Sequence, residues 1–545
     1  MTVCENLIIG GGLAGVTTAL ELLNHGKQVT LIDAQSKAAF GGQANHAFGG
    51  MLFVDTPIQR KNGIADSIEL ALSDWHSAAE FKESDQWGKM WANAYINHSQ
   101  SLVFNWLTGF GIKFLPVVHW VERGDFRPGN SVPRYHIAWG CGRNVVQTLI
   151  ERLEQHPNKH LLTLLFNHKV HDFELSNGRL IGCTAQNQES NSDNAKEDVR
   201  ITAENIILAC GGINGNLAKV KEVWDPCYGK FPDNILIGTH PTVDGLLHDK
   251  LRSKDCACAN VINLNQMWNY AAGVRHPQPE FKHHGLSLIP PRSSLWMDCY
   301  GNRVGPKPMM TGFDTHDLCK ETGALPRQYS WQVMNWKIAI KELAVSGTDQ
   351  NPHIRDKNVL KLAYELMFGN RRLVQSLIDD CEDVVTANSL PELVNKMNAL
   401  THDETVSLDN MQRDIEAYDD MIKRGERFYN DDQLRKIMQV RKWRGDKVRT
   451  CKNQPILDEK AFPLIAIKSH LISRKSMGGF ETNLQSKVLN ANGDVIDNLY
   501  AVGEAAGFGG GGISGIRSLE GTFLSNCILN GRAAAHDIAG KKLFD

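Results

Sequence analysis

Glycine placement is the feature that most limits what this chain can fold into. A short apolar run at 6–9 is followed at once by the glycine-rich stretch 10–15 (GGGLAG). Residues 16–24 then carry apolar side chains at helical spacing, and residues 28–33 form a second apolar run that ends in Asp33. The order strand, glycine turn, helix, strand predicts one βαβ unit of about 30 residues.

Each glycine of the motif Gly10-x-Gly12-x-x-Gly15 has a physical task in a dinucleotide-binding turn. Gly10 permits the tight turn, Gly12 lets a pyrophosphate approach the backbone, and Gly15 lets helix and strand pack closely. The helix start offers unpaired N–H groups and a partial positive charge to phosphate oxygens. Asp33 lies at the end of the next strand, where it is placed to accept hydrogen bonds from ribose hydroxyls. The motif is weak by itself in a chain with 48 glycines, so the prediction rests on its strand–helix context.

The composition is that of an ordinary soluble globular protein. The chain has 545 residues, of which 42% are hydrophobic and 22% charged, and its formal net charge is −2. A pI near 6.9 gives no reason to expect binding to nucleic acid or to an anionic membrane. No apolar run approaches the roughly 18 residues of a transmembrane helix, and the N-terminus shows no signal-peptide pattern, so we expect a cytoplasmic protein.

The 12 cysteines are scattered, which argues against a disulfide framework. The one close pair is Cys256-x-Cys258, and the nearest histidines that could join it are His248, His283 and His284. Zinc sites usually show repeated pairs two to four residues apart, so we predict no metal site here.

Glycine-dense segments recur along the chain and carry a family resemblance. They are 41–50 (GGQANHAFGG), 208–216 (LACGGINGN), 477–479 (MGG), 499–507 (LYAVGEAAG) and 531–532 (GR). With the N-terminal motif, these segments make the sequence resemble the fumarate reductase/succinate dehydrogenase flavoprotein superfamily, in particular its branch of 3-ketosteroid-dehydrogenase-like FAD-binding dehydrogenases. The resemblance covers most of the chain and implies an FAD cofactor, and the C-terminal motif argues against an NAD-linked oxidoreductase.

The resemblance implies a role for each of these segments. The second glycine loop closes over the pyrophosphate and flavin ring, a strand backbone at Val170 passes the adenine, and Glu504 holds the ribityl chain. A helix N-terminus within 514–519 is placed at the pyrimidine edge of the ring, where it favours the negatively charged reduced flavin. The predicted cofactor-binding residues are Gly10, Gly12, Leu13, Ala14, Gly15, Asp33, Gly41, Gly42, Gln43, Gly49, Gly50, Val170, Ala209, Gly211, Gly503, Glu504, Ser518 and Leu519.

One position departs from the pattern of relatives that bind FAD covalently. Those relatives carry a histidine before the second glycine pair, at the position of Gln43 in this sequence. A glutamine is no nucleophile for a flavin bond, so we predict FAD that is bound without a covalent link.

The expected fold class is α/β, with a split Rossmann-like FAD domain built from both chain ends and an inserted α+β capping domain. The predicted FAD domain spans residues 1–245 and 456–545. Residues 246–350, richer in Trp, His and Pro, are the predicted capping or substrate domain. Residues 351–455 are a mainly helical connecting segment, with helical patterns from 389 to 445, and a long helix is expected from about Ser514 to Ala539.

The substrate-binding residues of soluble fumarate reductases do not carry over to this chain. Lys475 stands where relatives have a histidine before the Met-Gly-Gly turn, Ser518 occupies the position of the last-helix arginine, and 309–317 contains no arginine. The C-terminal glycine segment also lacks the tyrosine that steroid dehydrogenases use to polarise the ketone. The predicted acid/base candidates are Lys475, Arg517, Tyr270 and His316, in that order.

We therefore expect an FAD-dependent enzyme that acts on a CH–CH bond next to a carbonyl by hydride transfer to or from flavin N5. The substrate is a small molecule, with a ketosteroid-like or other apolar compound preferred. Trp268 and Tyr270 either line an apolar pocket or belong to a core. The alternatives are a fumarate-reductase-like reductase of enones or organic acids, and a non-catalytic flavin-binding redox module. The sequence identifies neither the electron acceptor nor the oligomeric state.

Overall fold

The structure is a computed structural model of the chain that describes residues 2–125, 127–176, 179–188, 198–253, 256–278, 281 and 284–544. The chain forms two compact units, each assembled from separate stretches of sequence. Unit 1 consists of Met1–Val223, Thr239–Trp268 and Lys475–Asp545, and unit 2 consists of Trp224–Gly238 and Asn269–Arg474. Among the described residues, no helix is both long and apolar enough to cross a bilayer.

A largely parallel sheet forms the centre of unit 1. Its strand order is β19–β20–β8–β1–β2–β5, and the β6–β7 hairpin joins it at β8. The inner strands read as continuous apolar runs because both faces of a parallel sheet are covered. The strands are β1 (Thr2–Ile9), β2 (Val29–Ile32), β5 (Leu162–Leu165), β6 (His168–Ser176), β7 (Arg179–Asn187), β8 (Asp198–Leu208), β19 (Lys487–Leu489) and β20 (Val495–Ala501).

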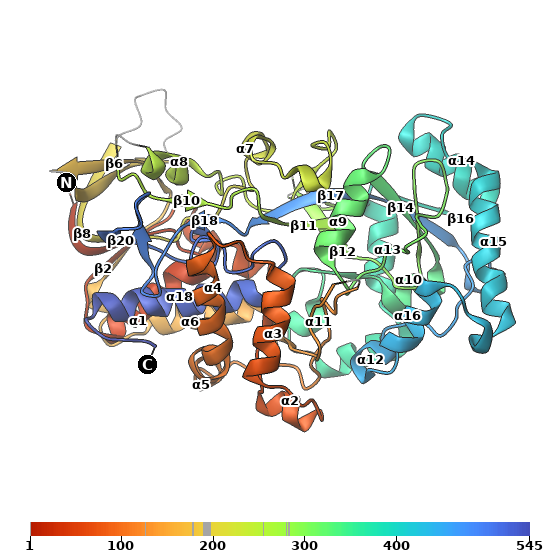
Figure 1. Ribbon diagram of the computed structural model, residues 1–545, viewed down its shortest axis with the longest axis horizontal. Helices are drawn as coiled ribbons and strands as arrows, with labels where there is room; N and C mark the ends of the chain where they lie inside the picture. The colour runs from red at the N-terminus through yellow and green to blue at the C-terminus, as the bar shows by residue number, and fades with distance from the viewer. Residues whose placement is uncertain are drawn as a thin grey trace. The chain divides into compact units, whose positions relative to one another are not determined.

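The two ends of the chain meet in this sheet. β1 and β20 lie on either side of β8, and both pair with it in parallel. Helix α1 (Leu13–Asn24) packs beside helix α18 (Thr522–Ile538), which Figure 1 shows as the red and blue helices lying next to each other. The hydroxyl of Thr18 donates to the carbonyl of Gly531 at 3.3 Å, so a glycine lets the two helices approach closely.

The remaining elements of unit 1 are short strands and helices around this sheet. They are β3 (Gly50–Leu52), α2 (Pro57–Lys61), α3 (Ile68–Ala79), α4 (Gln86–His98), α5 (Asn105–Gly109), β4 (Tyr135–Ile137), α6 (Cys141–Glu154), α7 (Leu217–Glu222), α8 (Leu246–Arg252), β10 (Val261–Ile262) and β18 (Gly479–Phe480). β3 pairs with β4, and β10 pairs with β18, both antiparallel.

Unit 2 is built on a second sheet, of order β13–β14–β17–β11–β12–β15, in which β9 and β16 also pair with β17. The strands are β9 (Leu236–Ile237), β11 (Met267–Arg275), β12 (Gly285–Ile289), β13 (Leu295–Met297), β14 (Tyr329–Asn335), β15 (Ala344–Val345), β16 (Val384–Ala387) and β17 (Leu464–Ser476). The helices are α9 (Thr315–Ala324), α10 (Trp336–Glu342), α11 (Pro352–Arg355), α12 (Val359–Phe368), α13 (Arg371–Asp380), α14 (Leu390–Thr401), α15 (Leu408–Arg424), α16 (Asp432–Val440) and α17 (Arg444–Val448).

The unit boundaries differ from those proposed on sequence grounds. Residues 246–268 lie in unit 1, and the helical stretch 351–455 lies in unit 2 with residues 269–350. The reason is long-range strand pairing. β9 pairs with β17 through Leu236 and Ile472, and β10 pairs with β18 through Val261 and Phe480.

The last helix begins at Thr522, which corrects the start near Ser514 expected from the sequence. Residues 507–515 cannot continue a helix because their glycines (Gly507, Gly509 to Gly512 and Gly515) have positive φ angles.

Candidate functional site

The turn after β1 has the geometry that its glycines predict. Gly10 has a φ of 112°, and a Cβ there would lie 2.3 Å from the carbonyl oxygen of Ala209. A Cβ on Gly15 would lie 2.0 Å from the carbonyl oxygen of Gly10, so only glycine allows α1 to start this close to the strand. Both glycines are therefore required by the fold of the polypeptide.

Gly12 is different, because the polypeptide leaves room for a side chain there. It is the N-cap of α1, no side chain caps the helix, and no protein atom lies within 4 Å of the position that a Cβ would occupy. Leu13, Ala14 and Gly15 form the first turn of α1. An uncapped helix start beside open space is the arrangement that accepts a phosphate group.

Asp33 organises the turn from the end of β2. One carboxylate oxygen accepts from the N–H of Gly11 at 2.5 Å and the other from the N–H of Gln35 at 2.7 Å. Burial raises the pKa of Asp33, although these two N–H groups act to lower it. Each oxygen keeps a second lone pair, so the carboxylate can still accept from a ribose hydroxyl.

The second glycine loop lies directly against the first. The N–H of Gly41 donates to the carbonyl of Gly11 at 2.8 Å, and a Cβ on Gly42 would lie 3.2 Å from the Cα of Gly12. The side chain of Gln43 is exposed and donates to the hydroxyl of Thr239 at 3.0 Å. Gly41, Gly42 and Gln43 are thus brought beside the helix start, as a loop covering a pyrophosphate requires.

Gly49 and Gly50 serve the fold of this region. A Cβ on Gly49 would meet the backbone of Cys141 at 2.6 Å, and a Cβ on Gly50 would meet the ring of Tyr135 at 1.8 Å. Contacts within the protein are enough to explain why both residues are glycine. Val170 is buried within β6.

The C-terminal glycine motif closes on the N-terminal one. Gly503 has a φ of 66°, its N–H donates to Asn530 at 2.9 Å, and a Cβ on it would lie 2.9 Å from the Cβ of Ala14. Ala209 and Gly211 follow β8, and Ala209 donates its N–H to the carbonyl of Ile9. Residues from the two ends of the chain and from the segment after β8 are therefore brought to the same edge of the sheet.

Glu504 is held by the turn at residues 476–479. Its carboxylate accepts from the N–H of Ser476 at 2.9 Å, and the hydroxyl of Ser476 donates to Asn214 at 2.7 Å. A Cβ on Gly212 would lie 2.7 Å from a carboxylate oxygen of Glu504. The acid is thus fixed next to the glycines that follow β8.

The tetraglycine at 509–512 is a close-approach loop, and its neighbour is helix α4. A Cβ on Gly510 would meet the carbonyl of Trp87 at 2.6 Å, and one on Gly88 would meet the carbonyl of Gly512 at 2.5 Å. Ser518 and Leu519 follow this loop and are buried ahead of α18. The Ser518 hydroxyl lies 2.9 Å from that of Thr522.

Several buried side-chain polar atoms of unit 1 have no hydrogen-bond partner among the described residues. Neither side-chain polar atom of Gln266 has a partner, and the same holds for Asn526 Oδ1, Asn530 Nδ2 and Ser514 Oγ. Each such atom costs about 1–3 kcal/mol when left unpaired. Gln266 has no motif around it, so its role becomes visible only when burial and partners are known.

These features fit a flavin dinucleotide. The uncapped start of α1, the space above Gly12 and the free acceptor positions of Asp33 suit a pyrophosphate and a ribose. Asn530 and Asn526 on α18 and Gln266 offer unpaired groups to a polar ring system. None of these residues is a nucleophile of the kind that links flavin covalently in relatives. Gln43, at the position of the linking residue, is not one either.

Lys475 is the one acid/base candidate that lies among aromatic rings of unit 1. Its ammonium nitrogen is 3.9 Å from the centre of the Phe523 ring. The Phe523 ring contacts Phe508 at 4.8 Å and Trp268 at 5.7 Å between ring centres. All three rings are buried, whereas Lys475 is partly exposed. We call these four residues the Lys475 cluster.

The other three candidates have different surroundings. Arg517 forms an ion pair with Glu80 at 2.5 Å, and Glu80 also contacts Arg127. Tyr270 and His316 belong to unit 2. The guanidinium of Arg474 lies 5.4 Å from the Tyr270 ring, and the ring of Tyr228 lies 5.2 Å from that of His316.

The histidine and cysteine residues considered as metal ligands are used differently. His248 forms a hydrogen bond with the carbonyl of Ala505 at 3.1 Å, and its ring stacks on Phe480. Burial lowers its pKa to about 4, so the ring is neutral at pH 7. Cys256 and Cys258 are half-buried and form no disulfide, and His283 lies outside the described residues.

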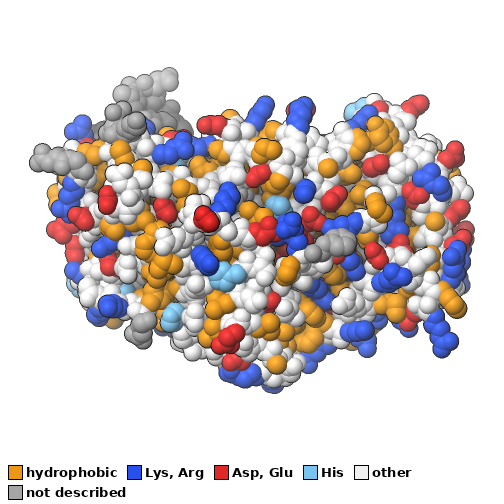
Figure 2. Space-filling view, viewed as in Figure 1, with side chains coloured by type: hydrophobic (Ala, Val, Ile, Leu, Met, Phe, Trp, Pro, Cys, Tyr) orange, Lys and Arg blue, Asp and Glu red, His pale blue; other side chains and the backbone are white. Residues whose placement is uncertain are grey.

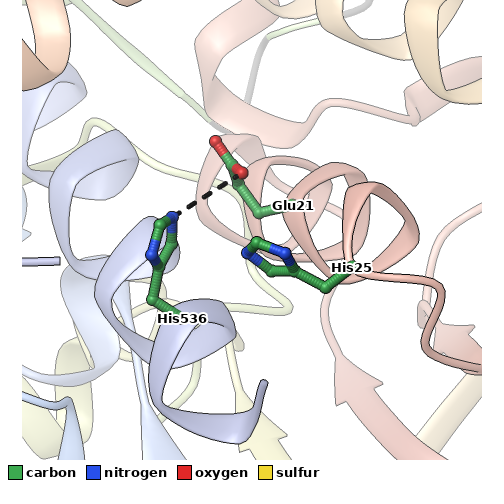
Figure 3. Close-up of side chains that lie close together, drawn as sticks. All are labelled: Glu21, His25 and His536. Atoms are coloured by element: carbon green, nitrogen blue, oxygen red, sulfur yellow. Dashed lines mark ion pairs between the residues drawn. The ribbon is translucent and has the colours of Figure 1, made fainter. Parts of the chain in front are cut away.

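A group of possible metal ligands occurs elsewhere in the described structure, where α1 ends beside α18. Figure 3 shows Glu21, His25 and His536, whose candidate ligand atoms lie within 4.8 Å of one another. Arg532 already donates to Glu21 at 2.8 Å, and the ammonium of Lys541 lies 3.1 Å from His25 Nδ1. The positive charges of Arg532 and Lys541 oppose the binding of a metal cation to this group. We therefore interpret the group as an ion-pair cluster that joins the two helices.

Comparison with known proteins agrees with this geometry. The model of the FAD binding domain family matches residues 5–524. A KsdD-like steroid dehydrogenase of Mycolicibacterium smegmatis is 37% identical over 99% of this chain and 100% of its own length. Two solved structures share the fold, each with a TM-score of 0.66. The first is 3-ketosteroid Δ1-dehydrogenase from Sterolibacterium denitrificans, with 13% identity over 99% of this chain and 100% of that one. The second is a flavocytochrome c3 fumarate reductase, with 16% identity over 99% of this chain and 78% of that one.

This chain belongs to the FAD binding domain family. It is an FAD-dependent oxidoreductase of the type that acts on CH–CH bonds, which confirms the prediction from the glycine motifs. The predicted α/β class, with an FAD unit assembled from both chain ends and an inserted second unit, is confirmed as well.

Proposed function

We propose that the protein oxidises a CH–CH bond next to the ketone of an apolar, steroid-like substrate. The M. smegmatis relative, which is similar along its whole length, carries the name of a steroid dehydrogenase. The observation in this chain that supports the proposal most directly is the Lys475 cluster, in which one cation stands among buried aromatic rings. A cation beside buried aromatic rings would suit an apolar molecule that carries one carbonyl.

The reaction removes two hydrogens from adjacent carbons. The carbon next to the ketone gives up a proton to a base, and its neighbour gives up a hydride, which carries away the electron pair of its own C–H bond. The electron pair that the departing proton leaves on the first carbon forms the C=C bond. When FAD is bound, its ring supplies the acceptor for the hydride. The work left to the chain is to bind the ketone, to take the proton and to exclude water.

Lys475 is proposed to bind the carbonyl oxygen. Its ammonium donates hydrogen bonds but accepts none, so it stabilises the negative charge that develops on that oxygen as the α-proton leaves. Arg517 is held by Glu80 and is proposed to position the loop before α18. Tyr270 and His316, which belong to unit 2, stay acid/base candidates on the sequence alone.

The main alternative, reduction of a fumarate-like dicarboxylate, is less well supported. Two carboxylates require at least two cations free to bind them. Arg517, the nearest arginine to the last-helix position, is already paired with Glu80.

Substrate specificity is tested by anaerobic reduction of the bound flavin. A panel of 3-ketosteroids, cyclic enones and dicarboxylates is mixed with the holoprotein, and loss of flavin absorbance near 450 nm is followed. We expect saturated 3-ketosteroids to bleach the flavin and Lys475→Met to slow bleaching at least 100-fold with unchanged flavin content. Lys452→Met, at an exposed lysine paired with Glu426, is the matched control. If no panel member bleaches the flavin, the proposed substrate class is wrong.

FAD is proposed to be bound without a covalent link. Gln43 stands at the position of the flavin-linking histidine in relatives, and its carboxamide N–H donates to the hydroxyl of Thr239. Acid precipitation is expected to release all the yellow colour into the supernatant, and a yellow pellet would contradict this.

The reaction is also proposed to take place in the cytoplasm. All 12 cysteines are free thiols in the structure, which suits a reducing compartment.

A further inference from the structure

One stretch of unit 2 is far more basic than the rest of the chain. Residues 436–452 carry seven basic side chains and one acidic side chain, whereas the whole chain has a formal net charge of −2. The stretch begins in α16 and ends just after α17. Most of its cations are exposed, but Arg449 near its end is half-buried. The oxidation proposed above uses none of these residues.

Arg292, in the loop between β12 and β13, is anchored to this stretch by one end of its guanidinium. Its Nη1 atom lies 2.8 Å from a carboxylate oxygen of Asp446 and donates to the hydroxyl of Thr450 at 3.2 Å. The opposite edge of the guanidinium is unused. Nε is buried without a hydrogen-bond partner, and Nη2 forms no hydrogen bond with any described residue. Arg292 therefore presents two parallel N–H groups in a fixed position.

The backbone beside this unused edge is glycine. A Cβ on Gly312 would lie 3.2 Å from Nη2 of Arg292 and 3.9 Å from its Nε, so a larger residue would crowd the edge. The φ of Gly312, 86°, also favours glycine here. The Arg292 side chain keeps 15% of its surface exposed. No protein side chain at position 312 thus competes for the two N–H groups.

Arg449 brings a second guanidinium close to the first. It directly precedes Thr450, which Arg292 contacts. Within the described part of the chain, the guanidinium of Arg449 forms neither a hydrogen bond nor an ion pair. Burial and the nearby positive charge of Arg292 lower the pKa of Arg449. An anion between the two guanidinium groups would relieve their repulsion and fill both sets of donors.

The carboxylates around Arg449 are engaged elsewhere. Asp446 is taken by the ion pair described above. Glu342 accepts hydrogen bonds from two neutral donors, and Glu365 lies 3.2 Å from a histidine of helix α11. None of these acids is in contact with Arg449 among the residues that the structure describes. The anion that would complete this place is therefore not supplied by those side chains.

We propose that Arg292 and Arg449 bind a phosphate group. The Nε and Nη2 edge of an arginine matches two oxygens of a phosphate or a carboxylate. A carboxylate carries a single charge, whereas a phosphate monoester carries about −1.5 to −2 at pH 7, which suits the surplus of basic residues at 436–452. The residues assigned to FAD belong to unit 1 and these belong to unit 2, so the group is not one of the FAD phosphates.

Calorimetric titration of the holoprotein at constant ionic strength tests the proposal. FAD then occupies its own phosphate-binding turn, which removes that turn from competition. Inorganic phosphate is expected to bind at one site per chain, and more tightly than acetate. Arg449→Met should raise the dissociation constant about 10-fold or more with unchanged flavin content. Lys442→Met, at an exposed lysine of the same basic stretch, is the matched control and should leave the affinity unchanged.

A second variant tests the edge of Arg292. Arg292→Lys keeps a cation beside Asp446 but removes the Nε and Nη2 pair, so phosphate binding should again weaken, while the thermal unfolding temperature reports whether the fold is kept. The proposal is overturned by any of three results: no saturable phosphate binding, equal affinities of wild type and Arg449→Met, or an equal loss in Lys442→Met.

Phenyl phosphate distinguishes the two sources of the group. Binding as tight as that of inorganic phosphate would support a phosphate carried on a larger molecule. Binding of inorganic phosphate alone would support the free ion. Acetate that binds as tightly as phosphate would show that the site does not select phosphate, and this would overturn the proposal.

Discussion

Gly12 shows most directly what a single residue contributes to this site. Its backbone has a φ of −74°, which any residue can adopt, and the protein leaves open space where a Cβ would stand. The fold therefore does not explain why the residue is glycine. A ligand that comes within contact distance of the backbone does explain it.

Gly12→Ala is expected to leave folding intact and to weaken FAD binding at least 10-fold, because the added methyl group fills the space that the pyrophosphate needs. Titration of the apoprotein with FAD, followed by quenching of flavin fluorescence, gives the dissociation constant. Gly109→Ala in α5, where a Cβ also meets nothing within 4 Å, is the control. Unchanged affinity in Gly12→Ala would mean that the cofactor lies elsewhere.

Asp383 in unit 2 is a second residue whose surroundings predict a measurable effect. Its fully buried carboxylate accepts from the backbone and guanidinium of Arg275 and lies 3.5 Å from His470. Burial acts to raise its pKa, but the hydrogen bonds from His470 and Arg275 prevail and lower it to about 2. Because the pKa is below that of the unfolded chain, the ionised form stabilises the folded state at pH values above about 4.

This stabilisation, about 2 kcal/mol, is expected to disappear as the pH falls from about 4 to 2. Urea unfolding of wild type and Asp383→Asn, followed by tryptophan fluorescence, measures it. The difference in unfolding free energy between the two proteins should shrink by that amount across this interval. A difference independent of pH would show that the carboxylate is not ionised in the folded protein.

At the scale of elements, helix α4 and the tetraglycine loop hold each other in place. The Trp75 indole on α3 donates to the carbonyl of Ile513, and the Trp91 indole on α4 donates to that of Asn483, both at 3.0 Å. Gly88 lets the backbone of α4 reach the carbonyl of Gly512. The loop ahead of α18 is thus positioned by helices that precede it by more than 400 residues.

Gly88→Ala is expected to force α4 and the loop apart, because its Cβ would lie 2.5 Å from a backbone oxygen. Overpacking of this kind costs about 1–3 kcal/mol. The thermal unfolding temperature and the flavin content of the purified protein should both fall. Lys89→Ala, at an exposed position of the same helix, should change neither. Equal values for both variants would show that the loop is not held by α4.

At the scale of the whole molecule, the division into two units predicts how the protein unfolds. The residues assigned to FAD lie in unit 1, and unit 2 has its own sheet and helices. The surface in Figure 2 carries both charge signs interspersed, in keeping with the net charge of −2. A ligand that binds one folded unit stabilises that unit by mass action, by about 2.7 kcal/mol at a concentration of 100 Kd.

Differential scanning calorimetry of apoprotein and holoprotein tests this division. We expect two transitions in the apoprotein, of which FAD raises only one. Limited proteolysis between the transitions should degrade one unit and leave fragments of the other. A single transition that shifts as a whole would mean that the two units unfold cooperatively.

Several features of the site were predictable because they depend on neighbours in sequence. β1, α1 and β2 follow from apolar periodicity, and the tight turn follows from Gly10 and Gly15. The order and content of the glycine segments also indicated FAD and the joining of both chain ends. These features arise from local backbone geometry and burial, which a short stretch of sequence largely determines.

Other features depended on contacts between residues far apart in the chain. The ion pair of Arg517 with Glu80, the unpaired carboxamide of Gln266 and the ring contacts of Lys475 have no signal in local sequence. The unit boundaries and the start of α18 at Thr522 depended on strand pairing and on positive φ angles at consecutive glycines. Sequence alone thus determined which cofactor the chain binds and which local elements carry its glycine motifs. The tertiary structure alone decided which side chains remain available for chemistry, because a side chain's availability depends on what lies against it in space.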